Sequence, residues 1–384
     1  MAGSVPRVLI VVLLGLLYLS PERQAAAGPI DITVMTQNLY LGANTDPLFA
    51  AKTLPELQTA IVNAANSVTA TNFPLRATAI AAEAAKAGGP LLIGLQEAEI
   101  VGQGGASLNY ADTLIAALKT QGLNYTYMIP GVGSAVHTGL KLDSTAAGFP
   151  PGSPNFVSVT DQDVVLVRTD VPEFAVKSVS APTFANTGTV TSPLFGAISL
   201  ERGYVLVDAT LDGVPFQFVS THLDGSLPDG SRTSANPLEV GEILTALGGT
   251  GQLQLVVGDL NATPSDLCAG LPCGPAELLA AGFTDTGAGL GPTCCQSPDL
   301  SNTVSILNRE YDYIFEKGFS STDSAALVGN QPFENMPPLW PSDHAGVVAT
   351  VTDVPEPAAA SLLVSAMFLF GAVGLRGRTQ KRRT

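Results

Sequence analysis

The sequence predicts a domain of the α/β class, and three observations support this. Short apolar runs rich in β-branched residues recur along the chain, as in DITVM at 31–35 and LQLVV at 253–257. Such runs are typical of buried strands. Ala-rich segments between these runs carry apolar residues at helical spacing. No internal repeat, and no linker long enough to separate domains, interrupts residues 28–353.

The elements are expected in the following order. A strand at 31–35 precedes helices at 55–66 and 74–87, a strand at 90–95 and a helix at 111–118. Residues 131–160 are rich in Gly, Ser and Pro and are expected to form one long loop. Next come strands at 164–167, 204–208 and 215–220, a helix at 238–247, and strands at 253–257, 311–315 and 346–351.

Residues 1–27 have the features of a secretory signal peptide. Arg7 precedes an apolar run from Val8 to Leu19, and small residues follow up to Ala27. The run is short for a membrane span, so a leader removed during export is expected. An uncleaved N-terminal anchor is the alternative.

Residues 354–384 form a second distinct end. Pro355-Glu356-Pro357 precedes eighteen residues without a charge, and five basic residues follow them. This order resembles the PEP-CTERM sorting signal of bacterial exported proteins. The resemblance implies a membrane helix before processing, an exosortase-type enzyme as a partner, and a final location in the cell envelope, on the cell surface or outside the cell. A simple tail anchor is the alternative.

The remaining portion is strongly acidic. It contains 11 basic and 31 acidic residues, which gives a net charge of about −20. Loose, charge-driven binding to nucleic acid or to anionic membranes depends on Lys and Arg, so this composition disfavours it. Turnover of a phosphate substrate at a metal site is still compatible with the charge.

All four cysteines lie in one segment: Cys268, Cys273, Cys294 and Cys295. Export to an oxidising compartment favours disulfides. A metal cluster is the rival interpretation, but the spacing matches no common zinc pattern and no histidine is close in sequence. Three pairings are open to four cysteines.

Polar residues that carry chemistry terminate the predicted strands. They occur in the motifs TQN, LQE, STH, GDLNATP, DYIF and SDH, which contain Asn38, Glu97, His222, Asp259 with Asn261, Asp312, and Asp343 with His344. One such end is an ordinary turn. Six ends with only Asn, Glu, Asp and His indicate a shared site at one rim of a sheet. Two of the three histidines fall in these motifs.

In this order, the six motifs resemble the endonuclease/exonuclease/phosphatase superfamily from Asn38 to His344. The resemblance implies one catalytic domain over 28–353. It also implies a four-layer sandwich, in which two mixed β-sheets pack face to face and are flanked by helices.

The resemblance also implies roles. Glu97 is similar to the main Mg²⁺ ligand, with Mn²⁺ as an alternative ion, and Asn38 and Asp343 lie beside it. Asp259 resembles the residue that orients or deprotonates the attacking water, and Asn261 the amide that binds a phosphate oxygen. His344 is similar to the histidine that contacts the phosphate, with Asp312 as its orienting carboxylate. His222 resembles the second histidine of the phosphodiesterase branches.

Elementary chemistry agrees with these roles. Phosphoester hydrolysis needs neutralised phosphoryl charge, a positioned water and help for the leaving oxygen, and Mg²⁺ prefers a few carboxylates plus waters. Asp259 and Asn261 are two residues apart at the end of a predicted extended strand, so both side chains are expected to point to the same side.

The sequence therefore predicts an exported, Mg²⁺-dependent phosphoesterase, most plainly a phosphodiesterase. Its substrate is expected to be a small diester, a lipid headgroup or nucleic acid. The alternatives are an extracellular endonuclease and a non-catalytic surface or matrix module.

Overall fold

A computed structural model describes residues 28–225, 232–248, 251–335 and 337–354. Within these ranges, Ile30–Asp353 forms one compact unit. The predicted signal peptide and sorting tail lie outside the described residues. Among the helices that are described, none is long and apolar enough to cross a membrane.

Two large mixed sheets make up most of this unit. The first has nine strands in the order β21–β24–β1–β2–β9–β3–β4, with β5 and β8 also paired to β9. Their bounds are β21 Ser321–Val328, β24 Gly346–Asp353, β1 Ile30–Asn38, β2 Leu92–Gln96, β9 Val157–Arg168, β3 Ile100–Gln103, β4 Ala106–Asn109, β5 Tyr125–Thr126 and β8 Val136–Asp143.

The second sheet has six strands in the order β10–β13–β14–β16–β20–β19. Their bounds are β10 Phe174–Ser180, β13 Tyr204–Leu211, β14 Val214–His222, β16 Leu253–Asp259, β20 Asp312–Lys317 and β19 Thr284–Asp285. Each large sheet has one parallel pair, β1 with β2 and β14 with β16. These pairs bring the carboxyl ends of two strands to the same edge.

Smaller sheets and helices complete the unit. The small strands are β11 Gly188–Ser192, β12 Gly196–Leu200 and β15 Arg232–Thr233 in one sheet, then the pairs β17 Leu267–Cys268 with β18 Leu271–Pro272, β22 Glu334–Asn335 with β23 Pro338–Leu339, and β6 Met128–Ile129 with β7 Gly133–Ser134. The helices are α2 Asp46–Ala50, α3 Leu54–Thr71, α4 Phe73–Lys86, α5 Tyr110–Thr120, α6 Asn236–Leu247, α7 Gly274–Ala280 and the 3₁₀ helix η1 Ser144–Ala147.

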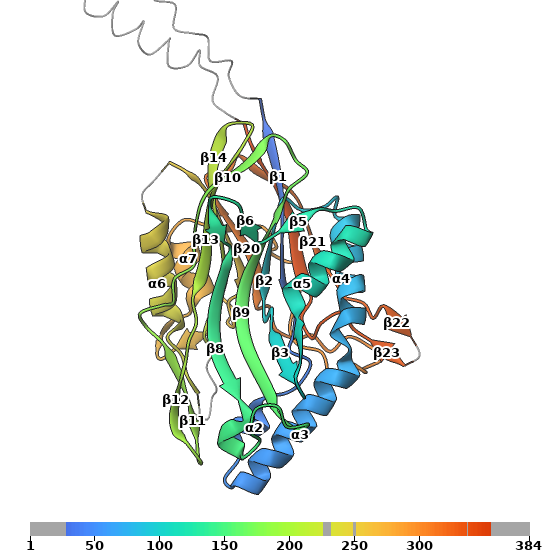
Figure 1. Ribbon diagram of the computed structural model, residues 1–384. Coiled ribbons are helices and arrows are strands. Elements are labelled where there is room, and N and C mark those ends of the chain that lie inside the picture. The colour runs from blue at the N-terminus through green and yellow to red at the C-terminus, as the bar shows by residue number, and fades with distance from the viewer. Residues whose placement is uncertain (1–27, 226–231, 249–250, 336, 355–384) are drawn as a thin grey trace, which may run out of the picture. The chain divides into compact units, whose positions relative to one another are not determined.

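The layers follow from the alternation of side chains along each strand. In β2, Ile93 and Leu95 pack against α4 and α5, whereas Leu92 packs between the two sheets. In β16, Val257 packs between the sheets and Val256 packs against α6 and α7. Figure 1 shows α4 and α5 on one side of the sheets and α6 and α7 on the other. This is the predicted sandwich of two sheets flanked by helices, and the fold class is confirmed.

The helices begin and end at recognisable signals. Asn72 has a positive φ of 48°, so it ends α3, and its side chain accepts a hydrogen bond from Leu75 N at the start of α4. Asn adopts this left-handed conformation more readily than most residues, and its side chain is a favourable helix cap. Asn109 caps α5 in the same way, through Asp112 N.

The two sheets approach closely near the ends of β2 and β14. A Cβ atom on Gly94 would lie 2.6 Å from Ser220 Oγ and 2.7 Å from Val257 Cγ2. Only glycine fits this position. Two residues further along β2, Gln96 Nε2 donates to Ser220 Oγ at 3.1 Å, and this buried hydrogen bond joins the two sheets.

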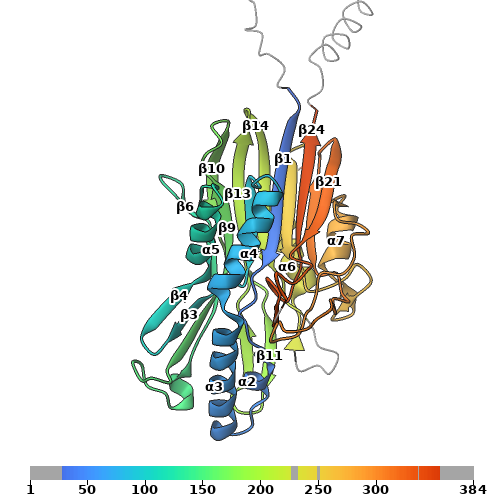
Figure 2. The same cartoon turned by 90° about the vertical axis from the view of Figure 1, so that its right-hand side faces the viewer.

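The prediction of one long loop over 131–160 is wrong. This segment contains β7, β8, η1 and the beginning of β9. Strand β8 pairs antiparallel with β9, for example Val136 with Val164. Gly- and Ser-rich composition hid this strand because its stability comes from the pairing and not from local propensity. The other predicted strands and helices are present, with ends shifted by a few residues. Figure 2 shows β1, β24 and β21 side by side.

Candidate active site

Six chain segments converge at one edge of the two sheets. Strand β1 ends at Asn38 and β2 ends beside Glu97. In the second sheet, His222 at the end of β14 is in register with Asp259 at the end of β16, and Asp259 is in register with Asp312. The loop that carries Asp343 and His344 leads into β24, the neighbour of β1. The fold thus brings together residues that lie up to 306 positions apart.

Asn38 connects the carboxylates of the two sheets. Its Nδ2 donates to Glu97 Oε1 at 3.1 Å and to Asp259 Oδ2 at 3.0 Å. Its Oδ1 accepts a hydrogen bond from Tyr40 N at 2.8 Å, and this bond fixes which end of the amide carries the nitrogen. Asn38 therefore positions Glu97 and Asp259, and its own carbonyl oxygen is already engaged.

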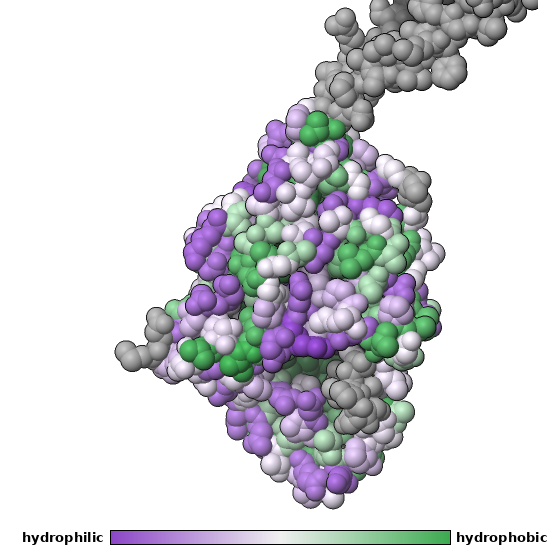
Figure 3. Space-filling model, turned by 180° about the vertical axis from the view of Figure 1, so that it is seen from behind, coloured by the Kyte–Doolittle hydropathy of each residue, from purple (hydrophilic) through white to green (hydrophobic). Residues whose placement is uncertain are grey.

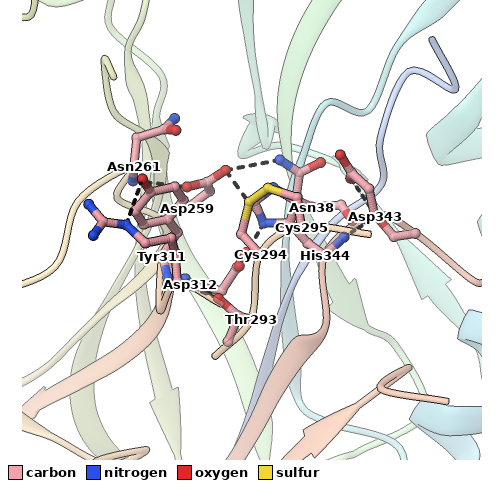
Figure 4. Close-up of a disulfide and its surroundings, with 12 residues drawn as sticks. Asn38, Asp259, Asn261, Thr293, Cys294, Cys295, Tyr311, Asp312, Asp343 and His344 are labelled. Carbon is pink, nitrogen blue, oxygen red and sulfur yellow. Dashed lines mark hydrogen bonds and ion pairs between the residues drawn. A yellow bond between two sulfur atoms is a disulfide. The ribbon is translucent and has the colours of Figure 1, made fainter. Parts of the chain in front are cut away.

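Asp259 lies between the two histidines of the site. Its Oδ2 lies 3.6 Å from His222 Nε2 and 3.8 Å from His344 Nδ1. Its Oδ1 accepts a hydrogen bond from Asn261 N at 2.9 Å. His344 Nδ1 lies 2.7 Å from Asp312 Oδ2, so Asp312 holds the ring of His344 in place. Figure 4 shows Asp259, Asp312 and His344 together with Asn38 and Asp343.

The electrostatics of the group depend on its burial. The pKa of Asp259 is raised to about 7, chiefly by burial and also by Asp312, against the lowering effect of His344. Burial also raises the pKa of Asp343 to about 7, with His344 lowering it and Glu97 raising it. For His344, burial alone would lower the pKa, but Asp312, Asp259 and Asp343 together raise it well above its usual value. The three carboxylates therefore favour the protonated, positively charged form of His344.

A cavity of about 340 Å³ opens beside this group. We call it the acidic cavity, because five of its twenty lining residues are acidic: Asp46, Glu97, Glu99, Asp161 and Asp343. His222, Arg202 and Cys295 also line it. Asp259 and His344 do not line the cavity but contact residues that do, since Asp259 Oδ2 lies 3.6 Å from His222 Nε2 and His344 Nε2 lies 3.7 Å from Cys295 Sγ. The volume is within the range of small-molecule sites.

Asn261 differs from the expected geometry. Strand β16 ends at Asp259, and Asn261 has a positive φ of 50°, so the chain turns there and does not continue as an extended strand. Asp259 and Asn261 therefore do not end one extended strand, and the prediction that both side chains point to the same side is wrong. Instead, the backbone N–H of Asn261 donates to Asp259 Oδ1, and the side-chain Nδ2 of Asn261 donates to Leu223 O at 3.0 Å.

Arg202 is a site residue that the sequence reasoning missed. It precedes β13, and its side chain donates to Asp161 Oδ2 at 2.9 Å and to His222 Nδ1 at 3.0 Å. Because arginine only donates, His222 Nδ1 must accept, and a proton on the neutral ring belongs to Nε2. An arginine at the start of a strand is ordinary in sequence, so no local signal marks it.

Arg76 is a second site residue that the sequence did not reveal, and it holds the backbone of two loops at the site. The side chain is fully buried in α4. It donates to the backbone carbonyl oxygens of Thr71, Leu39, Tyr40 and Pro341. These bonds tie the loop after β1 to the loop before His344, so Arg76 sets the distance between two parts of the site.

The cysteines form two local pairs, Cys268 with Cys273 and Cys294 with Cys295. Cys295 Sγ lies 3.7 Å from His344 Nε2. Cys294, Cys295 and His344 are close enough to hold a metal, but both sulfurs are oxidised and no thiolate is present. The second candidate cluster, Asp259, Asp312 and His344, is already joined by the hydrogen bond between His344 and Asp312.

The carboxylates of Glu97 and Asp343 fit a divalent cation better. Both line the acidic cavity. Glu97 is held by Asn38 and by Leu41 N, which donates to its Oε2 at 3.0 Å. Glu97 raises the pKa of Asp343 after burial does, so the two negative charges repel each other. Two oxygen ligands with space for water match the way Mg²⁺ is bound, and a cation would relieve this repulsion.

The comparisons with known proteins give a fold relationship. No family model matches the sequence, and no curated protein matches it. An endonuclease/exonuclease/phosphatase family protein from Bacteroides thetaiotaomicron aligns over 85% of this chain and 96% of its own, at 15% identity and a TM-score of 0.51. A family member from Leptotrichia buccalis aligns over 83% and 99%, at 16% identity and a TM-score of 0.49. At 15% identity, the similarity to the Bacteroides thetaiotaomicron protein shows a shared fold and nothing more.

Proposed function

We propose that this protein hydrolyses phosphoesters, and phosphodiesters in particular. The reaction is proposed to depend on a divalent cation, Mg²⁺ or Mn²⁺. The observation that carries the proposal is the contact of Asp259 with Asn38, and its closeness to His222 and His344, beside a cavity lined by Glu97 and Asp343. A water-activating carboxylate, two imidazoles and an oxygen-rich cation site are the parts that this reaction needs. The shared fold is consistent with the proposal.

Glu97 and Asp343 are the proposed ligands, and Asn38 orients Glu97 from one side. A bound divalent cation would neutralise charge on the phosphoryl oxygens. Asn38 serves this site by hydrogen bonding and not by direct coordination, because both ends of its amide are engaged.

Asp259 is the proposed base. Its carboxylate accepts a proton from a water molecule whose oxygen forms the new P–O bond, while the bond to the ester oxygen breaks. The leaving oxygen takes up a proton, so that one diester and one water give a monoester and an alcohol. A base with a pKa of about 7 suits transfer near neutral pH.

The histidines are proposed to bind the phosphate. His222 carries its proton on Nε2, because Arg202 donates to Nδ1, so Nε2 can donate to a phosphoryl oxygen. Asp312, Asp259 and Asp343 favour the protonated form of His344, and this form would supply positive charge beside the phosphate. Its Nε2 faces Cys295 Sγ in this structure, so access of the phosphate to that atom requires a small displacement.

A small substrate is favoured over duplex nucleic acid. Arg202 is the only Lys or Arg that lines the acidic cavity, and it is paired with Asp161. Proteins that grip a phosphate backbone normally place several basic residues along it. We therefore propose a small diester or a lipid headgroup as the substrate.

Export is also proposed, from the sequence of the two ends. The leader pattern at 1–27 and the Pro-Glu-Pro, apolar and basic order at 354–384 support delivery to the envelope or beyond, with processing by an exosortase-type enzyme. Intact-mass measurement of protein from the native host's envelope tests this. Full-length protein there would favour a simple anchor.

The test of the activity combines metal removal with substitution. Hydrolysis of bis(p-nitrophenyl) phosphate should stop with EDTA and return with Mg²⁺ or Mn²⁺. Glu97→Gln and Asp343→Asn should each lower kcat by about 10²-fold or more and weaken Mg²⁺ binding in calorimetry. Glu173→Gln, at an exposed position, is the matched control.

Three outcomes are informative. No hydrolysis with any metal would favour a non-catalytic module. Unchanged rate and Mg²⁺ affinity in Glu97→Gln would remove that residue from the site. Preferred cleavage of supercoiled DNA over a choline phospholipid, with a rate that falls steeply as salt rises, would favour a nuclease.

A further inference from the structure

We propose that the substrate is an amphiphilic phosphoester with a single aliphatic chain, and that this chain binds in a second cavity beside the acidic one. The inference rests on the proposed function, because it assigns the substrate class of that same site.

The second cavity has a volume of about 350 Å³. It is lined by residues of α2, α3 and η1, of strands β3, β8 and β9, and of the hairpin of β11 and β12, and it is open to solvent on one side. Sixteen of its twenty lining residues are apolar, so we call it the apolar cavity. Water gains few hydrogen bonds in such a space, whereas an aliphatic group loses none.

The sequence of α3 explains why this space is open. Leu57, Ile61, Ala64 and Val68 recur at helical spacing and line the cavity on one face of the helix. The alanine is too small to fill the gap between the helix and the sheet. Leu57 belongs to a small cluster with Ala51 and Ala147, separate from the three main cores. Leu41 and Val101 on another wall of the cavity belong to the core on the side of α4 and α5, so the apolar cavity lies between that core and the small cluster.

The two cavities adjoin each other. Both are lined by Leu41, Thr45, Phe49, Leu142 and Val159. A ligand that occupies both cavities meets carboxylates and His222 in the acidic cavity and apolar side chains in the apolar cavity. Figure 3 shows a hollow in one face where hydrophobic residues lie below a hydrophilic rim. This juxtaposition matches a polar phosphate group joined to an apolar chain.

The volume limits the chain. A dry cavity of roughly 150 Å³ lined by Leu, Ile and Phe binds benzene, so 350 Å³ corresponds to about a dozen carbon atoms. One aliphatic chain of that length fills this volume. Such a chain is the occupant that both the size and the adjoining acidic cavity favour.

Binding of n-alkyl phosphates with 4 to 12 carbons tests the inference without turnover. Calorimetry is done below the micelle concentration, with Mg²⁺ present, and inorganic phosphate is the reference. Each methylene group buried should lower Kd by up to about fourfold, with a plateau near a dozen carbons. The same Kd for all lengths would overturn the proposal.

Variants locate the chain. Ala64→Phe fills the apolar cavity and should lower the ratio of affinities for the 12-carbon and 4-carbon phosphates at least tenfold. Ala70→Phe, an exposed position on the same helix that does not line the cavity, should keep the ratio. Ile61→Ala should move the plateau to longer chains, and it decides the matter if circular dichroism shows that Ala64→Phe is misfolded. No effect of the cavity variants on the ratio would overturn the proposal.

Hydrolysis separates this inference from the proposed function. With alkyl p-nitrophenyl phosphates, kcat/KM should rise with chain length in the unmodified protein and much less in Ala64→Phe. Turnover without dependence on chain length would leave the phosphoesterase function standing and overturn the apolar site. Chain-dependent binding without turnover of any diester would instead overturn the substrate role of the ligand. Hydrolysis confined to diacyl lipid vesicles, unaffected by Ala64→Phe, would also contradict the single-chain assignment.

Discussion

The side-chain amide nitrogen of Asn38 lies 3.0 Å from Oδ2 of Asp259, and it thereby joins the end of β1 in one sheet to the end of β16 in the other. Because the same nitrogen also donates to Glu97, one residue sets the relative positions of the proposed base and the proposed cation ligand. The two halves of the site are thus connected by this amide, and also by Arg202, which bonds Asp161 in one sheet and His222 in the other.

Replacing this amide should disable the site. Asn38→Asp puts a third carboxylate within about 3 Å of two others, where like charges repel. We expect kcat to fall by about 10²-fold or more, with the far-UV circular dichroism unchanged. Asn155→Asp, at an exposed position, is the control. A rate within threefold of the unmodified protein would contradict the central role of Asn38.

The two histidines should act as a unit, because both lie within 4 Å of the same oxygen of Asp259. His222→Ala and His344→Ala should each lower the rate by roughly 10²-fold. The double variant should lose less than the product of the single effects, as expected for residues that share a partner. Steady-state rates with a chromogenic diester measure this, and full activity in either single variant would exclude that histidine from the site.

The buried carboxyl of Glu239 predicts a pH-dependent stability. Burial, and after it the charge of the neighbouring Asp224, together raise its pKa to about 9, although the hydrogen bond from Asp224 N lowers it. A raised pKa in the folded state means that its contribution to stability is present below about pH 4.5 and is lost as the pH rises toward 9.

Glu239→Gln removes this pH dependence, since an amide is neutral at every pH and can donate to Asp224. We expect the variant to unfold at least about 2 °C higher than the unmodified protein at pH 8, with a smaller difference at pH 5. Thermal unfolding followed by circular dichroism checks this. A larger stabilisation at pH 5 than at pH 8 would show that the carboxyl is ionised in the folded protein.

The disulfide pairing can be read directly by peptide mapping. Glutamyl endopeptidase cleaves after Glu277, between the Cys268–Cys273 pair and the Cys294–Cys295 pair. Without reduction, the two cysteine-containing peptides should separate, and each should gain two alkylated thiols only after reduction. Peptides that stay linked until reduction would mean that the bonds connect the two pairs.

The sequence determined the strands that form the centre of both sheets and the polar residues at their ends. A buried strand such as β2 is encoded locally, by consecutive apolar residues, and its end is marked by Gln96 and Glu97. Strand β8 could not be found in this way, because it depends on pairing with β9. The extended geometry expected at Asn261 was wrong because the turn there is held by a contact to Asp259.

Only the tertiary structure decided which side chains touch and what space they leave. The contact of Arg202 with His222, the four carbonyl bonds of Arg76 and the pairing of the cysteines join residues whose sequence neighbours give no sign of them. The apolar cavity is another such feature, because it is the space left between side chains of α3 and β9. Hydrophobic periodicity is a property of a few consecutive residues, whereas a contact or a cavity depends on how distant segments pack, so the sequence by itself determined the elements and the fold determined the site.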